Sequence, residues 1–180
     1  MGGMGSTEGT GPPPTSSQAS DRGAPPPLDL VQDLVNTRNL MRGTDRLSRT
    51  AAGADLEALR DLREAIRAVL LTHTTGQPLD PTVVGRLRAL ALAAPLRAEI
   101  GEDGSAAPAA LDDNAVARVL AAIASAGQTG TWRRLKVCAN PDCQWAFYDA
   151  SRNRSGTWCD MSICGSRVKM RAYRRRAAGT

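Results

Sequence analysis

Over most of residues 28–127, apolar side chains recur every three or four positions with polar residues between them. This is the spacing of helices that bury one face. Four segments carry it and are predicted to be helices: 28–41, 55–76, 80–95 and 112–127. The prediction is strongest for the second segment, because its apolar stripe runs without interruption over about four helical turns. The stripe is formed by Leu56, Leu59, Leu62, Ile66 and Leu70.

Residues that start and stop helices stand at the ends of two of these segments. Asp55 and Asp80 each precede an apolar stripe and are expected to be N-caps, and Pro81 fits the first helical position. Gly76 and Pro95 are expected to end the same two helices. Glycine accepts the left-handed conformation that follows many helices, and proline cannot continue one.

The period changes at "LRAEI", residues 96–100, where apolar and polar residues alternate before the turn "GEDG". Alternation next to a glycine-containing turn is typical of a β-hairpin, and the weaker "AAPAAL", residues 106–111, is the expected second strand. The predicted fold class is therefore mainly α with a short β-hairpin (α+β). It consists of a helical N-terminal domain followed by a small four-cysteine module with a C-terminal helix.

The composition divides the chain into three parts. Residues 1–27 hold six of the eleven prolines together with glycine and serine, and they predict a disordered tail. Residues 132–180 hold all six aromatic residues and all four cysteines, with 11 basic against 3 acidic residues, whereas residues 1–131 carry 12 basic and 15 acidic residues. This break predicts a helical domain over 28–131 and a basic module over 132–180. No segment has the length and apolarity of a signal peptide or a membrane helix, which predicts a cytoplasmic protein without membrane contact.

The cysteines form two C-x4-C pairs with fifteen residues between them. Four thiolates at tetrahedral positions suit Zn²⁺, and the Asn-Pro-Asp turn in "CANPDC" lets both sulfurs of a pair face one metal. The alternatives are a disulfide pair, which a reducing cytoplasm disfavours, a redox thiol switch, and cysteines that fill a core. Zinc would contribute on the order of 10 kcal/mol to the folding of so small a module. We expect one structural Zn²⁺ per chain, bound by Cys138, Cys143, Cys159 and Cys164.

Aromatic and basic residues accompany the cysteines. A strand and a turn are expected between the two pairs, with Trp145 and Phe147 on one face, where they could stack on bases or form the core around the metal. Ser166 is the expected cap of a C-terminal helix. Its basic residues, which fall at helical spacing, are predicted to contact nucleic acid: Arg167, Lys169, Arg171, Arg174 and Arg175. Charge runs also occur on solvated helix faces, but with zinc bound this module keeps a formal charge of about +6, which favours phosphate.

Residues 138–176 resemble the CGNR zinc finger. The shared features are the two cysteine pairs, an F-x-D-x-S stretch at Phe147, Asp149 and Ser151, a tryptophan before the third cysteine, and a signature followed by a basic helix. The signature reads C-G-S-R here, because Ser166 replaces the usual asparagine.

The upstream residues resemble the ABATE domain, in "DLVNTR" at 33–38 and "LREAIRAVL" at 62–70. The resemblance implies a stress-induced transcription regulator whose upstream domain binds a ligand. Asn36 and Thr37, two hydrogen-bonding residues in an otherwise apolar helix, are the expected ligand contacts. Alternatively, both side chains bond locally to the backbone at a helix end.

We therefore predict a zinc-containing, DNA-binding transcription regulator that acts in the cytoplasm at the nucleoid. The helical domain is expected to sense a small-molecule effector or to mediate association, for example as a homodimer, while the basic helix binds duplex DNA. The alternatives are a zinc-stabilised adaptor for an acidic protein and an RNA-binding zinc finger. An enzyme is not predicted, because the sequence has no phosphate-binding glycine loop and no serine elbow. Its one histidine, His73, is expected to serve packing or to lie at the surface near a helix end.

Overall fold

The structure is a computed structural model that describes residues 23–49 and 51–178. Most of the tail predicted over 1–27 lies outside the described residues. The α-helices are α2 (Leu28–Asn36), α3 (Gly53–Thr75), α4 (Pro81–Ala93), α5 (Ala115–Gln128) and α6 (Ser166–Ala178). The strands pair antiparallel as β1 (Arg38–Asn39) with β2 (Thr44–Asp45), β3 (Leu96–Ile100) with β4 (Ala106–Ala110), and β5 (Leu135–Val137) with β6 (Ala146–Tyr148). Short helical turns are η2 (Leu47–Arg49), η3 (Trp132–Arg134) and η4 (Met161–Gly165). Helices with small strand pairs confirm the α+β class.

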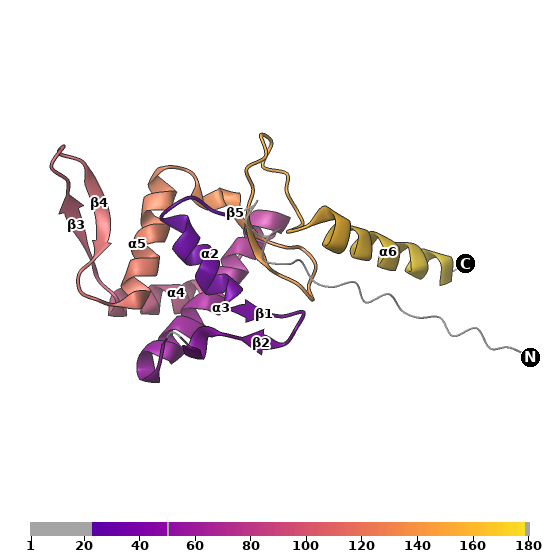
Figure 1. The fold of residues 1–180 in the computed structure, drawn as a ribbon, viewed down its shortest axis with the longest axis horizontal. Coiled ribbons are helices and arrows are strands. Elements are labelled where there is room, and N and C mark those ends of the chain that lie inside the picture. The colour runs from indigo at the N-terminus through magenta and orange to yellow at the C-terminus, as the bar shows by residue number, and fades with distance from the viewer. Residues whose placement is uncertain (1–22, 50, 179–180) are drawn as a thin grey trace, which may run out of the picture.

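The core is built around α3, which contacts α2, α4, α5 and β5 near the middle of the body (Figure 1). Its predicted apolar stripe faces this core, where Leu62, Ile66 and Leu70 are almost fully buried. α2 and α5 contribute mainly valines and alanines to the same cluster. The apolar spacing in the sequence therefore identifies the residues that hold the helical part together.

Three of the predicted helix ends are confirmed. Gly76 follows α3 in the left-handed conformation with φ of 72°, and its N–H donates to the carbonyl of Thr72. The Asp80 side chain caps α4, and the helix ends two residues before Pro95.

The predicted N-cap of α3 is wrong. The helix begins at Gly53, and Asp55 lies within the first turn. A carboxylate there still favours the helix, because it faces the positive end of the helix dipole.

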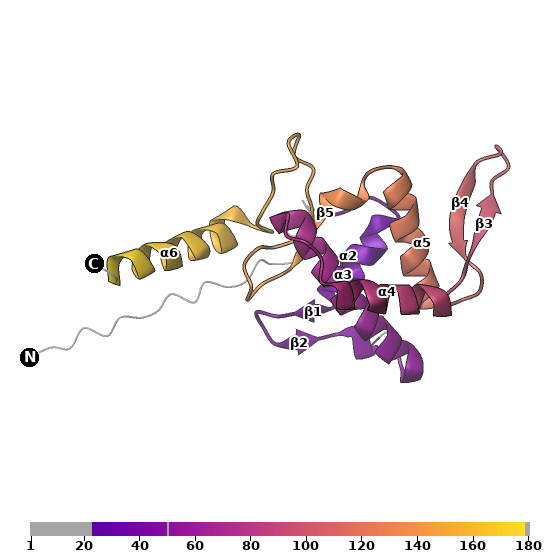
Figure 2. The same cartoon turned by 180° about the vertical axis from the view of Figure 1, so that it is seen from behind.

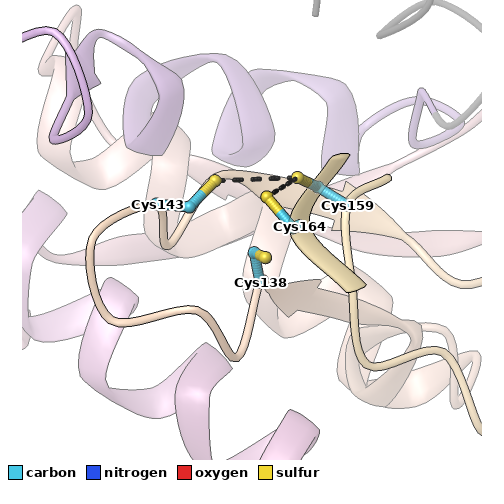
Figure 3. Close-up of side chains that lie close together, drawn as sticks. All are labelled: Cys138, Cys143, Cys159 and Cys164. Atoms are coloured by element: carbon cyan, nitrogen blue, oxygen red, sulfur yellow. Dashed lines mark hydrogen bonds between the residues drawn. The ribbon is translucent and has the colours of Figure 1, made fainter. Parts of the chain in front are cut away.

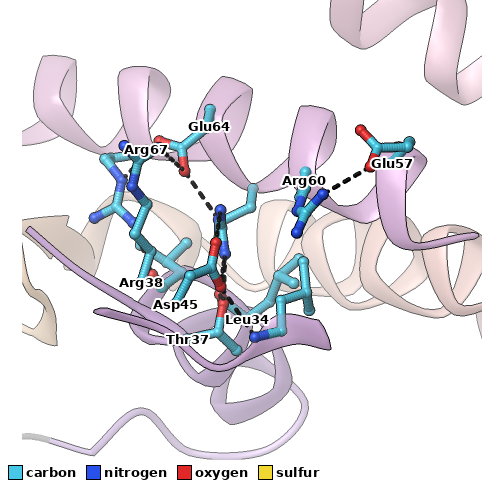
Figure 4. A network of polar contacts seen from close by, with 11 residues as sticks. Leu34, Thr37, Arg38, Asp45, Glu57, Arg60, Glu64 and Arg67 are labelled. Carbon is cyan, nitrogen blue, oxygen red and sulfur yellow. Dashed lines mark hydrogen bonds and ion pairs between the residues drawn. The ribbon is translucent and has the colours of Figure 1, made fainter. Parts of the chain in front are cut away.

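The helix predicted over 28–41 is also too long. α2 ends at Asn36, after which Arg38 pairs with Asp45 in the two-residue strands β1 and β2. The buried Arg63 of α3 causes this change of direction. It donates from both terminal nitrogens to the Asp45 carboxylate, at 2.8 and 2.7 Å, and from one of them to Thr37 Oγ1 at 3.0 Å. Figure 4 shows Asp45 and Thr37 on the side of α3 from which these bonds are made. These bonds from Arg63 lower the pKa of Asp45 to about 2. The pairing fixes the β1–β2 turn on α3.

The predicted hairpin is confirmed over the expected residues, with Leu96 opposite Ala110 and Ile100 opposite Ala106. It stands at one side of the molecule beyond α5, and α6 projects from the other side (Figures 1 and 2).

The strand predicted between the cysteine pairs is β6, which pairs with β5. Leu135 and Val137 of β5 and Ala146 of β6 are fully buried in the same cluster as the helical core. The cysteine-containing segment is therefore packed directly on α2 and α3. The division at residue 131 stays a prediction.

Candidate metal centre and nucleic-acid interface

The four cysteine sulfurs lie within 4.8 Å of one another (Figure 3). Cys143 Sγ and Cys159 Sγ are 3.6 Å apart, and Cys159 Sγ and Cys164 Sγ are 3.8 Å apart. Four thiolates about 2.3 Å from a tetrahedral Zn²⁺ would be separated by about 3.8 Å. A disulfide needs about 2.05 Å, and all four cysteines are free. The donor set and its dimensions fit zinc and exclude a disulfide in this arrangement. Within the described residues, this is the group of side chains suited to hold a metal ion.

The first cysteine pair is brought together by the turn that the sequence predicts. The Asn140 carbonyl accepts the N–H groups of Cys143 and Gln144 at 2.9 and 3.1 Å, so the chain folds back within "CANPDC". Cys138 N–H donates to the Trp145 carbonyl at 3.0 Å, which closes the turn where β5 leads into it. The buried Asn140 amide also points its Nδ2 towards Cys164 Sγ, at 4.0 Å.

The second pair is set by a helical turn that begins before Ser166, the residue predicted as the cap. Asp160 is the cap of this turn: its side chain accepts from Ile163 N–H at 3.0 Å, and its carbonyl accepts from Cys164 N–H at 3.0 Å. The π-helical segment η4 then runs directly into α6. The wider turn places Cys164 on the side of the helix that faces the other sulfurs. The C-terminal helix is thereby continuous with a metal ligand.

Gly165 stands where the chain approaches its neighbours closely. A Cβ at this position would lie 2.5 Å from Met161 Sδ and 3.2 Å from Trp158 Cδ1. The glycine of the signature lets the tryptophan before the third cysteine pack beside the second pair. Trp145 and Trp158 both pack against the cysteine cluster. Their contacts are those of the small core around the metal, which is the second of the two roles considered for Trp145. Phe147 is buried as well but does not belong to the cysteine cluster.

A buried ion pair fixes the loop between β6 and the third cysteine. Lys136 Nζ and Asp149 Oδ2 are 2.8 Å apart, and both side chains are about 95% buried. Asp149 also accepts the Ser151 hydroxyl at 2.6 Å and the Gly156 N–H at 2.7 Å. Burial raises the pKa of Asp149, but these bonds outweigh it and bring the pKa to about 2. The F-x-D-x-S stretch therefore holds the loop that returns to Cys159.

Side chains of α2 and α3 hold the backbone of the cysteine-containing segment. Asn36 Oδ1 accepts Ala146 N–H at 2.8 Å, and Asn36 Nδ2 donates to the Ala146 carbonyl at 3.0 Å. Arg67 donates to the carbonyls of Gln144 and Val35, each at 2.8 Å. Thr74 Oγ1 donates to the Val137 carbonyl at 2.7 Å. The zinc centre is thus tied to the helical part by bonds that flank both ends of the first cysteine pair.

The sequence interpretation did not identify Arg67 or Thr74 as residues that hold the cysteine-containing segment. A sequence signal for Arg67 exists, since Arg63 and Arg67 lie four residues apart beside the apolar stripe of α3, where charged residues are rarely buried without partners.

His73 takes the packing role expected for it. Its Nδ1 lies 2.9 Å from the Leu135 carbonyl, and its ring meets Trp132 edge-on at 5.2 Å. Burial lowers the pKa of His73, so the ring is neutral at pH 7.

The predicted ligand contacts face protein atoms. Both the oxygen and the nitrogen of the Asn36 amide are hydrogen-bonded to the backbone of Ala146. Thr37 Oγ1 donates to the Leu34 carbonyl at 2.7 Å and accepts from Arg63. Thr37 bonds locally at the helix end, as the alternative interpretation has it, whereas Asn36 bonds to a backbone 110 residues away. A ligand at this position stays a prediction.

The basic residues of α6 are divided between contacts and open surface. Arg167 directs Nη1 at Met41 Sδ, 3.2 Å away, and Arg171 pairs with Asp142 at 2.7 Å. Lys169 and Arg174 are exposed, and the side chain of Arg175 is outside the described set. These contacts hold Arg167 against Met41 and Arg171 against Asp142, the neighbour of the cysteine ligand Cys143. The distal part of α6 extends away from the body (Figure 2).

Comparison with known families gives two matches that together cover most of the chain. The model described as "CGNR zinc finger" matches residues 134–177. The model described as "ABATE: Putative stress-induced transcription regulator" matches residues 22–127. A search of curated proteins finds no match. In the described part of the chain, no helix has both the length and the apolarity needed to cross a bilayer. The finger match and the four-sulfur cluster confirm one structural Zn²⁺ site.

Proposed function

Because the chain belongs to the ABATE family, described as putative stress-induced transcription regulators, and carries a CGNR zinc finger, we propose that it regulates transcription by binding duplex DNA through α6. The observation that carries the proposal is the position of this helix. α6 continues directly from the zinc ligand Cys164 and extends away from the body. The zinc centre would hold the base of the helix rigidly, while its distal turns remain accessible to a large partner.

The charge of α6 suits nucleic acid. The helix carries six basic residues and no acidic residue, and it is about 20 Å long. The major groove of DNA is wide enough for an α-helix, and arginine can contact phosphates or the edge of guanine. The loop between β6 and Cys159 adds Arg152 and Arg154, both exposed, which the sequence interpretation did not include. These two side chains extend the basic surface and are part of the proposed interface.

Each predicted contact residue has a place in this proposal. Lys169, Arg174 and Arg175 would neutralise phosphates. Arg167 would make the most specific contact, because it is nearest the zinc centre, and would exchange its contact with Met41 Sδ for the edge of a base. Arg171 would exchange its pairing with Asp142 for a phosphate. In this role the protein would act in the cytoplasm at the nucleoid.

The helical domain is proposed to sense a small-molecule effector or to mediate association. A ligand that engaged Asn36 or Thr37 would have to displace their contacts with Ala146, Leu34 and Arg63. Binding at Asn36 would therefore alter how β6 is held, which gives a physical route from an effector to the finger. Screening metabolites by thermal shift on wild type and Asn36→Ala tests this part. A ligand that stabilises both proteins equally would remove Asn36 from the site.

Duplex binding is tested by fluorescence anisotropy with the zinc-loaded full chain and labelled DNA. The Lys169→Ala/Arg174→Ala variant should lose about tenfold in affinity, or about 1.4 kcal/mol. The matched control is Arg86→Ala/Arg88→Ala, which removes the same charge from exposed positions on α4 and should bind as wild type does. Equal losses in both variants would contradict a specific role of α6. Preferential competition by single-stranded RNA would favour an RNA-binding finger, and no affinity for either nucleic acid would favour an adaptor for an acidic protein.

A further inference from the structure

The hairpin at the far side of the molecule from α6 has one closed edge and one open edge. β4 lies between β3 and α5, and β3 is the outermost strand in both views (Figures 1 and 2). Within the described residues, β3 pairs with β4 alone. All five β3 residues are exposed, among them Leu96 at 38% and Ile100 at 68%. An exposed strand edge with apolar side chains is a ready template for pairing with another strand.

The register shows which backbone groups of β3 point outward. Gly101 N–H donates to the Ser105 carbonyl, and Leu111 N–H donates to the Pro95 carbonyl, so these are the hydrogen-bonded positions of the hairpin. Antiparallel pairs alternate between bonded and non-bonded positions. The backbone N–H and C=O groups of Leu96, Ala98 and Ile100 are therefore directed away from β4.

Pro108 closes the opposite edge of the hairpin. It faces Ala98 in the register, so by the same alternation its backbone nitrogen points outward from β4, and proline has no N–H to offer there. α5 also packs against β4. The open edge of β3 is thus the one available for strand addition.

The sequence of β3 fits its own copy. When two β3 strands pair antiparallel about a twofold axis at Ala98, each Arg97 lies opposite the partner's Glu99, and each Leu96 lies opposite the partner's Ile100. The three outward-facing residues then form the hydrogen-bonded positions. Arg97 and Glu99 fall at non-bonded positions, where facing side chains are closest. A twofold axis at Arg97 or at Glu99 would instead place like charges opposite each other.

We propose that two copies of this chain associate through β3, forming one four-stranded sheet in the order β4–β3–β3–β4. One face of this sheet carries two Arg97–Glu99 ion pairs, and the other carries the leucine, isoleucine and alanine side chains. The contact is isologous, as in most homodimers. It is also small, so the dimer forms in a concentration-dependent manner. The inference develops the association part of the proposed function and does not depend on DNA binding.

The test is sedimentation velocity of the zinc-loaded full chain over a range of concentrations, without nucleic acid. Wild type should convert from monomer to dimer as the concentration rises. Arg97→Glu and Glu99→Arg should each remain monomeric, since both place like charges opposite each other. The double variant Arg97→Glu/Glu99→Arg should dimerise again, and a mixture of the two single variants should form a heterodimer. The matched control Arg86→Glu, at an exposed position on α4, should behave as wild type.

Ala98→Pro provides a second test that leaves the hairpin bonds in place, because the N–H that it removes points away from β4. It should abolish the dimer while zinc content and thermal midpoint stay at wild-type values. A wild-type protein that remains monomeric at every concentration would overturn the proposal. So would a dimer that persists in both single charge variants, since its contact would lie elsewhere. Neither result bears on whether α6 binds DNA.

Discussion

Replacing Asn36 with alanine should destabilise the zinc-finger segment and the helical core together. The Asn36 amide makes two hydrogen bonds, 2.8 and 3.0 Å long, to the backbone of Ala146, which is fully buried. Without the amide, the Ala146 N–H loses its partner in a region that water does not reach. The Ala146 carbonyl keeps a longer bond, 3.3 Å, from Gln32 Nε2.

The expected loss follows from this geometry. Leaving a buried donor unsatisfied costs about 1–3 kcal/mol, and the missing bond to the carbonyl adds less because Gln32 remains. We expect a decrease of about 2–3 kcal/mol in the free energy of unfolding. With a urea dependence of about 2 kcal/mol/M, the unfolding midpoint should fall by about 1 M or slightly more.

Urea unfolding in the presence of zinc measures this loss, followed by both circular dichroism and tryptophan fluorescence. The two signals report different parts of the chain, because all the tryptophans lie beyond residue 131. Coincident shifts are expected, since Ala146 belongs to the shared core. The matched control is Asn153→Ala, at an exposed loop position, which should unfold as wild type does. Equal midpoints for Asn36→Ala and Asn153→Ala would refute the reasoning and restore a mainly ligand-binding role for Asn36.

Two other predictions concern the metal and the pH. Cys159→Ser removes one of the four sulfur ligands, so the zinc content measured by elemental analysis should fall well below the one equivalent expected for wild type. The thermal midpoint of the whole chain should fall with it. Undiminished zinc content would count against the assigned ligands. The lowered pKa of His73 means that this side chain binds a proton more readily in the unfolded chain than in the folded chain. The contribution of the neutral imidazole to the free energy of unfolding is therefore complete above about pH 6.5 and is lost as the pH falls below that value. Stability of wild type should therefore decline more steeply between pH 7.5 and 5.5 than that of His73→Gln, and parallel profiles would show that the imidazole does not contribute.

Features encoded by neighbouring residues could be predicted from the sequence. The stop of α3 at Gly76, the Asp80 cap and the β3–β4 hairpin depend on residue types within a few positions of each other. The four cysteines were also predictable, because equal spacing and a turn-forming "CANPDC" are local signals that need no knowledge of the fold.

Features that depend on distant partners could not be predicted in the same way. α2 ends at Asn36 because the next residues are held by Arg63, which lies 26 positions further along the chain from Thr37. The bonds from Asn36 to Ala146 span 110 positions, so the sequence indicated a hydrogen-bonding residue in an apolar helix but not its partner. The turn before α6 begins at Met161 because Cys164 must face the other sulfurs, which the helix pattern alone does not encode.

The dependence of duplex DNA affinity on salt concentration tests most directly whether α6 binds phosphate. If the helix neutralises four phosphates, log K should fall against log salt with a slope of about −3.6 for wild type. Replacing Arg171, Arg174 and Arg175 together with alanine should reduce the magnitude of the slope by about 0.9 for each phosphate that is no longer neutralised, towards about −0.9, while the Arg86→Ala/Arg88→Ala control keeps the wild-type slope. An unchanged slope and affinity in the triple variant would contradict the proposal that α6 is the DNA-binding element.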